Sequence, residues 1–180
     1  LATPWGNEDL ATDGVIVSGS FRPDVALLRG SHLEVDAASG GPAIDGWGRL
    51  SDPAYFAAGN ILRGVETAGW CWAEGRRTAR AVAAALEGRL PAPEGSRITL
   101  AHPALQLAVP QRLAASGPDM AHDRLQVRLC APVRGTLLLQ RDGQTLVSEK
   151  IDSRPERRIS LPLPAVQGGA PLTLTIEEER

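Results

Sequence analysis

Residues 52–69 have the sequence DPAYFAAGNILRGVETAG, and the rest of the chain can be interpreted outward from them. The apolar run 55–58 predicts a short buried strand, and Gly59 with Asn60 predicts a sharp turn after it, because glycine has no side chain to obstruct the backbone. A loop with two more glycines leads to residues 70–86, which are rich in Ala and Arg and predict a helix. The residues expected on the buried face of this helix are Ala73, Ala79, Val82 and Leu86. Such a strand, turn, loop and helix present backbone N–H groups to an anionic or electron-rich ligand.

Three motifs of the chain resemble those of a known enzyme family. Residues 55–60 (YFAAGN) resemble the second flavin-binding motif of the FAD- and NAD(P)-dependent oxidoreductases related to the pyridine nucleotide–disulfide reductases, which usually have Asp in place of Asn60. Residues 13–24 (DGVIVSGSFRPD) resemble the strand that returns from the nicotinamide domain of that family. Residues 74–76 (EGR) match the helix that follows. The resemblance covers residues 10–90, about half of the chain.

The resemblance implies FAD as a cofactor, and NAD or NADP as a possible second one. It implies that Asn60 bonds a ribitol hydroxyl of the flavin with Gly59 beside it, and that the backbone N–H groups of Glu66, Thr67 and Ala68 face the pyrimidine edge of the flavin ring. The residues alone also allow a simpler interpretation, in which Gly59 and Asn60 form a turn and Thr67 or Glu66 caps the helix.

A Gly-x-Gly-x-x-Gly loop, which holds a dinucleotide pyrophosphate on a helix N-terminus, is absent from the sequence. The chain also begins with Leu1 rather than Met. We therefore expect a missing N-terminal half, or a partner chain, to supply the Gly-rich ADP-binding loop. The chain alone should bind FAD weakly or not at all.

The sequence pattern changes after residue 90. Prolines and a glycine in residues 91–95 predict a linker, and short alternating segments predict six or seven strands in residues 96–180, with a hairpin turn at Asp142 and Gly143. We predict an antiparallel β-sandwich of immunoglobulin-like type for residues 96–180. Residues 1–90 are interpreted as the C-terminal part of an FAD/NAD(P)-binding domain. The fold class is therefore mixed (α+β or α/β): a partial Rossmann-like segment followed by the sandwich. The Rossmann-like segment would consist of a strand, a small β meander with strands at 33–36 and 43–45, the strand at 55–58 and the helix.

The composition excludes several classes of function. A net charge of -2 gives no footprint for nucleic acid, and no apolar run approaches the length of a membrane span. Cys71 and Cys130 stand in unlike contexts and form no metal-ligand cluster, so a reducing, cytoplasmic location is expected. His32, His102 and His122 share no catalytic spacing and are expected at the surface or in turns.

The resemblance implies that the chain is part of a flavin-dependent oxidoreductase that passes electrons between NAD(P)H, FAD and a small substrate. The flavin carries the redox chemistry and the protein positions and tunes it, so no side chain is singled out as catalytic and none as a metal ligand. One alternative is a non-catalytic interaction or assembly module built on the β-sandwich. Another is a stand-alone nucleotide-binding protein with a rearranged Rossmann-like fold.

Overall fold

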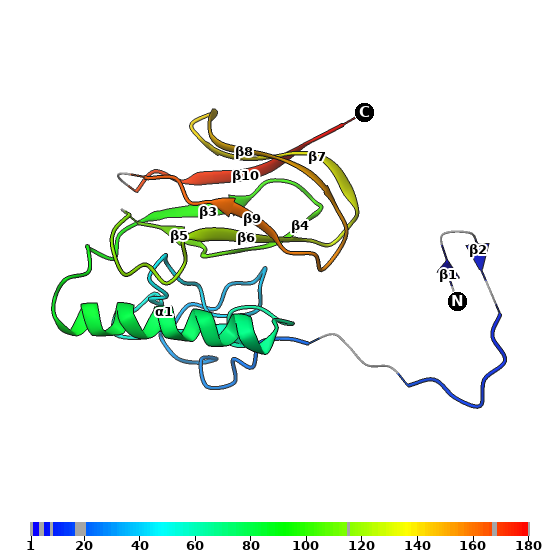
Figure 1. The fold of residues 1–180 in the computed structure, drawn as a ribbon, viewed down its shortest axis with the longest axis horizontal. Coiled ribbons are helices and arrows are strands. Elements are labelled where there is room, and N and C mark those ends of the chain that lie inside the picture. The colour runs from blue at the N-terminus through cyan, green and yellow to red at the C-terminus, as the bar shows by residue number, and fades with distance from the viewer. Residues whose placement is uncertain are drawn as a thin grey trace.

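The computed structural model describes residues 2–3, 6–7, 9–16, 21–114, 116–166 and 169–179. Two main sheets lie on one side of a long helix, and an N-terminal segment extends away from this body (Figure 1). The elements in chain order are β1 (Ala2–Thr3), β2 (Gly6–Asn7), the 3-10 turn η1 (Gly59–Ile61), α1 (Ala68–Leu86), β3 (Ser96–Leu100), β4 (Leu105–Val109), β5 (Arg112–Leu113), β6 (Arg124–Leu129), β7 (Val133–Arg141), β8 (Gln144–Ser153), β9 (Ile159–Pro162) and β10 (Leu172–Glu178). The mixed α and β fold class is confirmed, and β-structure predominates.

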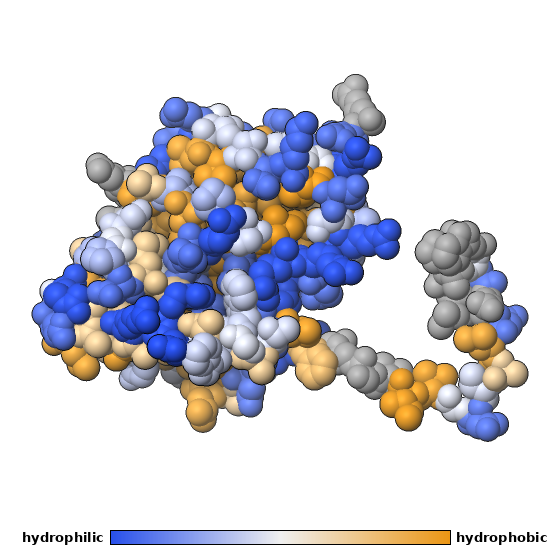
Figure 2. Space-filling model, viewed as in Figure 1, coloured by the Kyte–Doolittle hydropathy of each residue, from blue (hydrophilic) through white to orange (hydrophobic). Residues whose placement is uncertain are grey.

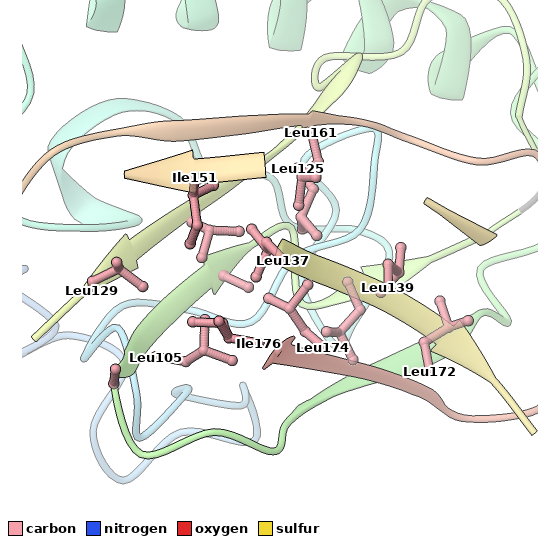
Figure 3. Close-up of a cluster of buried hydrophobic side chains, with 14 of the residues drawn as sticks. Leu105, Leu125, Leu129, Leu137, Leu139, Ile151, Leu161, Leu172, Leu174 and Ile176 are labelled. Carbon is pink, nitrogen blue, oxygen red and sulfur yellow. The ribbon is translucent and has the colours of Figure 1, made fainter. Parts of the chain in front are cut away.

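The two main sheets face each other across one apolar core. Their strand orders are β5-β3-β10-β7-β8 and β4-β6-β9. Alternate residues of β10 are buried, as the period of a strand requires when one face packs on a core. The leucine and isoleucine side chains of both sheets point toward one another in Figure 3, where the labelled residues are Leu105, Leu125, Leu129, Leu137, Leu139, Ile151, Leu161, Leu172, Leu174 and Ile176.

The larger sheet is not purely antiparallel. β3 pairs with β10 in parallel, with Leu172 opposite Ile98, whereas its other strand pairs are antiparallel. The expectation of an antiparallel sheet is wrong at this pair, because β3 joins a strand far away in the sequence and no hairpin fixes its direction. The hairpin of β7 and β8 is confirmed. Asp142 (φ 49°) and Gly143 (φ 78°) both adopt the positive φ that a two-residue turn of this kind needs.

Residues 21–67 contain far less regular structure than the sequence predicts. The expected strand at 55–58 forms a single bridge, between Phe56 and Arg49, and Tyr55 is exposed. The expected meander at 33–45 is likewise one bridge, between Val35 and Pro42. These predicted strands are wrong because the backbone bonds here close turns rather than a ladder. Residues 14–16 of the expected returning strand are exposed and not in a strand, and residues 17–20 lie outside the described residues.

The predicted helix is confirmed as α1, but its buried face is not the predicted one. Thr67 is the N-cap, and its Oγ1 accepts a hydrogen bond from the backbone of Trp70. Ala79 and Leu86 are exposed. The buried residues of α1 are Glu74, Thr78, Ala81 and Ala84. The apolar spacing misled here because a buried ionic group on the helix replaces part of its apolar face.

The smaller sheet is buried on both faces. From β4, Leu105 and Ala108 contribute to the core between the sheets, whereas Leu107 and Val109 pack on the opposite side. The second cluster is completed by residues of the loop region, Leu33, Ile44, Leu50 and Leu62. Residues 33–62 therefore cover the outer face of this sheet. As a result, the sheet lies close to the loop before α1. No helix among the described residues is long and apolar enough to cross a membrane.

Candidate functional site

The turn after residue 58 has the backbone conformation that the sequence suggests. Gly59 has φ 79° and is buried, and its N–H donates to Oε2 of Glu74 on α1 over 2.6 Å. Asn60 is exposed, and its Oδ1 accepts the backbone N–H of Glu66 over 2.9 Å. The side chain of Asn60 thus closes the loop of residues 60–66 at the entrance to α1.

Glu66 is the centre of a buried ionic network. Its side chain is fully buried, and its Oε1 accepts bonds from Arg63 Nε at 2.9 Å and from Arg128 Nη2 at 2.8 Å. Its Oε2 pairs with Arg158, whose guanidinium also lies 3.9 Å from the ring centre of Trp70. One carboxylate therefore joins the loop to β6, to the segment before β9 and to the first turn of α1.

Glu74 forms the second centre of the network. Its Oε1 accepts a bond from Arg63 Nη2 over 2.9 Å and lies 3.5 Å from Nδ1 of His122. Burial lowers the pKa of His122 to about 4, against the opposing attraction of Glu74, so the imidazole is neutral at pH 7. Three guanidiniums, those of Arg63, Arg128 and Arg158, then face two buried carboxylates.

Arg128 also holds the backbone of the loop. Its Nη1 donates to the carbonyl of Gly64 over 2.5 Å and its Nη2 to that of Val65 over 2.7 Å. Val65 has φ 59°, a left-handed conformation that a β-branched residue rarely adopts. Strained residues of this kind persist only where their surroundings fix them, and they gather at functional sites. A side chain at Gly64 would collide with the backbone of Phe21.

Unpartnered donors follow directly after this loop. The backbone N–H groups of Thr67 and Ala68 have no acceptor among the described residues, and both residues are exposed. Around Gly69, no heavy atom lies within 4 Å of the place where a Cβ would stand. A pocket of about 250 Å³ lies beside the loop and is lined by Phe21, Arg22, Asn60, Gly64, Val65 and Glu66.

The five residues predicted for the site thus lie in one short segment, but in different settings. Gly59 is buried against α1, Asn60 and Glu66 bond each other at the pocket, and Thr67 and Ala68 begin the helix. The N–H of Glu66 is already bonded to Asn60, which leaves the next two amides as the free donors.

Sequence reasoning missed the residues that support the segment. His122, expected at the surface or in a turn, is 2% exposed and contacts Glu74. Arg128 alternates with apolar residues along β6, a pattern that predicts a solvent-facing side chain. In the structure its side chain is only 6% exposed. No spacing in the sequence joins either residue to Glu66, since the contacts cross from one sheet to a distant loop.

Cys71 and Cys130 are both free, the first partly buried and the second exposed. Among the described residues, no group of three or more His, Cys, Asp or Glu side chains could hold a metal ion. Comparisons of the chain with protein-family models, with curated proteins and with solved structures gave no match.

Proposed function

We propose that this chain forms the ribitol and isoalloxazine side of the FAD site in a flavin-dependent oxidoreductase. The enzyme would pass electrons between NAD(P)H, FAD and a small substrate. The observation that carries the proposal is the start of α1, where the amides of Thr67 and Ala68 have no acceptor in the part of the chain that the structure describes. They directly follow the loop that lines a pocket together with Asn60. When bound, FAD would supply the hydride and electron transfer, while the residues of this chain orient it and stabilise charge.

The donors present fit the edge of a flavin. The amides of Thr67 and Ala68 and the side-chain amide of Asn60 can all donate, and the ring and ribitol of a flavin offer oxygen and nitrogen acceptors. The helix N-terminus carries a partial positive charge, which favours the negative charge that reduction places on the ring.

The rest of the FAD site would come from a second polypeptide segment that carries the Gly-rich ADP-binding loop. This expectation is supported by exposed apolar side chains in the segment that precedes the site in the sequence. Val15 is 80% exposed, Ile16 96% and Phe21 68%. Figure 2 shows apolar atoms (orange) on the extended segment that stands off the body. Pairing of residues 14–16 with further strands would bury them and complete a Rossmann-like domain, with residues 96–180 as an immunoglobulin-like sandwich against its flavin side.

We place the enzyme in the cytoplasm. Both cysteines are free thiols, which suits a reducing compartment. NAD and NADP are both compatible with this side of the site, because the residues that read the adenosine ribose would lie on the other segment.

The test is the visible absorbance of the purified chain after incubation with FAD, alone and together with the segment that supplies the Gly-rich loop. We expect flavin to be retained only in the combined form. Retention by the chain alone would mean a complete site within these residues, as in a stand-alone nucleotide-binding protein. Loss of flavin from both forms would refute the proposal and favour a non-catalytic interaction module.

A pair of glycine substitutions in α1 separates flavin contact from stability. Gly69→Ala and Gly75→Ala both place a methyl group in open space, and both should stabilise the helix, by up to about 1 kcal/mol. Only Gly69 adjoins the free amides, so only its Cβ should obstruct the ring. We expect Gly69→Ala to weaken FAD binding at least tenfold in the combined form and Gly75→Ala to leave it unchanged. Equal affinities would contradict the placement of the flavin at the start of α1.

A further inference from the structure

We propose that the β region, residues 96–179, contributes to this site and that Arg128 of β6 acts as a positioning residue. Arg128 fixes the backbone of residues 64–66 and thereby sets the direction of the free amides of Thr67 and Ala68. The inference rests on the proposed function for what these amides bind, but not for the contact itself. If so, the β region is part of the flavin site and not a separate module.

The bonds of Arg128 are concentrated on the loop. Its two terminal nitrogens reach the carbonyls of Gly64 and Val65 and the carboxylate of Glu66, at 2.5, 2.7 and 2.8 Å. Nη1 also lies 3.5 Å from Oε2 of Glu156, a mostly exposed side chain outside the loop. The planar fork of a guanidinium can hold two acceptors in a fixed relation, whereas the single ammonium of lysine cannot. The Nε of Arg128 is buried and has no partner among the described residues. The bonds from the two terminal nitrogens to the loop must therefore offset the free-energy cost of burying this side chain.

The loop requires such a restraint. Val65 is 55% exposed, so packing does not explain its left-handed conformation. The bonds to the carbonyls on either side of its Cα do, because rotation of Val65 toward an ordinary φ would turn those carbonyls away from Arg128. The same rotation would reorient the peptide groups that follow, which lead into the N-terminus of α1.

A second arginine of the β region holds the other end of the loop. Arg158, directly before β9, pairs with the remaining oxygen of Glu66 and stacks on Trp70 in the first turn of α1. Arg128 lies on β6, and Arg158 directly precedes β9, the strand that pairs with β6. This sheet thus supports both the loop and the start of the helix.

The first test is hydrogen exchange by mass spectrometry on the chain without flavin. Arg128→Lys keeps the buried charge beside Glu66 but cannot bridge the two carbonyls. We expect the hydrogen-bonded amides within residues 60–70, those of Leu62, Glu66 and Trp70, to exchange at least tenfold faster, with β7 and β10 unchanged. Arg124→Lys is the matched control, because Arg124 lies on the same strand, is exposed and, among the described residues, its side chain bonds Ser160 alone. Unchanged exchange in residues 60–70, or equal acceleration throughout the chain, would overturn the proposal.

The second test is the midpoint potential of the flavin in the FAD-loaded combined form. Arg128→Lys should lower the potential relative to wild type and to Arg124→Lys, because misdirected amides stabilise the reduced ring less. An unchanged potential would overturn the positioning role. Loss of flavin from every form would instead refute the proposed function, and the exchange data would then decide by themselves whether Arg128 fixes the loop.

Discussion

Two regions of this molecule are held together in different ways. Residues 96–179 form ladders of backbone hydrogen bonds around an apolar core, whereas residues 21–67 form turns closed by short-range backbone bonds and by bonds from side chains to the backbone. Asp45 shows the second kind of order, since its Oδ1 accepts the backbone N–H of Trp47 and of Arg49 and its Oδ2 pairs with the Arg49 guanidinium over 2.6 Å. Likewise, the N–H of Ile44 donates to the side chain of Gln111.

The comparison shows which contacts fix the backbone of the candidate site. A ladder spreads its free energy over many equivalent bonds, but an irregular loop depends on a few buried polar groups, each expensive to lose. The loop before α1 is of the second kind, and two of its supports come from the β region. The regular region therefore acts as a scaffold for the irregular one.

The largest effect should follow from the loss of the central carboxylate. Glu66→Gln leaves three guanidiniums with a neutral amide, and we expect a loss of about 3–5 kcal/mol in the free energy of unfolding, measured in urea. Leu139→Ala, which truncates a fully buried core side chain, should lower the free energy of unfolding by a similar amount, about 2–5 kcal/mol. Glu156→Gln is the control, because that side chain is 60% exposed and should matter little. A loss under 1 kcal/mol for Glu66→Gln would show that the network does not hold the loop region.

The next effect concerns pH. The pKa of His122 is about 4 when the protein is folded and 6.5 ordinarily, so the unfolded chain binds the proton more tightly. The contribution to stability is present above pH 6.5 and is lost as the pH falls toward 4, by on the order of 3 kcal/mol at most. His122→Asn should flatten the dependence of the unfolding free energy on pH in this window. An unchanged slope in His122→Asn would contradict the assignment.

The smallest effect should distinguish the two regions most clearly. Val65→Gly relieves a left-handed φ of 59°, which offsets the greater flexibility of glycine, so stability should change by no more than about 1 kcal/mol. Val147→Gly, in β8, removes a partly buried side chain from a ladder and should destabilise by more than that. Thermal unfolding of both variants makes the comparison, and a larger loss for Val65→Gly would mean that its side chain, not its backbone, stabilises the loop.

Much of the β region could be predicted from the sequence, and little of the loop region. Alternation marked β6 and β10, and the Asp142–Gly143 pair marked the hairpin, because these signals are local. The strands predicted at 33–45 and 55–58 failed because apolar and β-branched residues there pack on β4 from irregular backbone. Direction also escaped prediction, since alternation is the same in parallel and antiparallel pairs.

The sequence by itself determined the helix, a cap at Glu66 or Thr67, and the turn at Gly59. Each depends on residues within a few positions of one another, where backbone sterics and capping decide the outcome. Only the tertiary structure decided that Arg128 and Arg158 reach Glu66, and that Glu74 and His122 are buried. Ionic contacts between distant segments leave no periodic trace in a sequence, because they depend on how a sheet, a loop and a helix pack against one another.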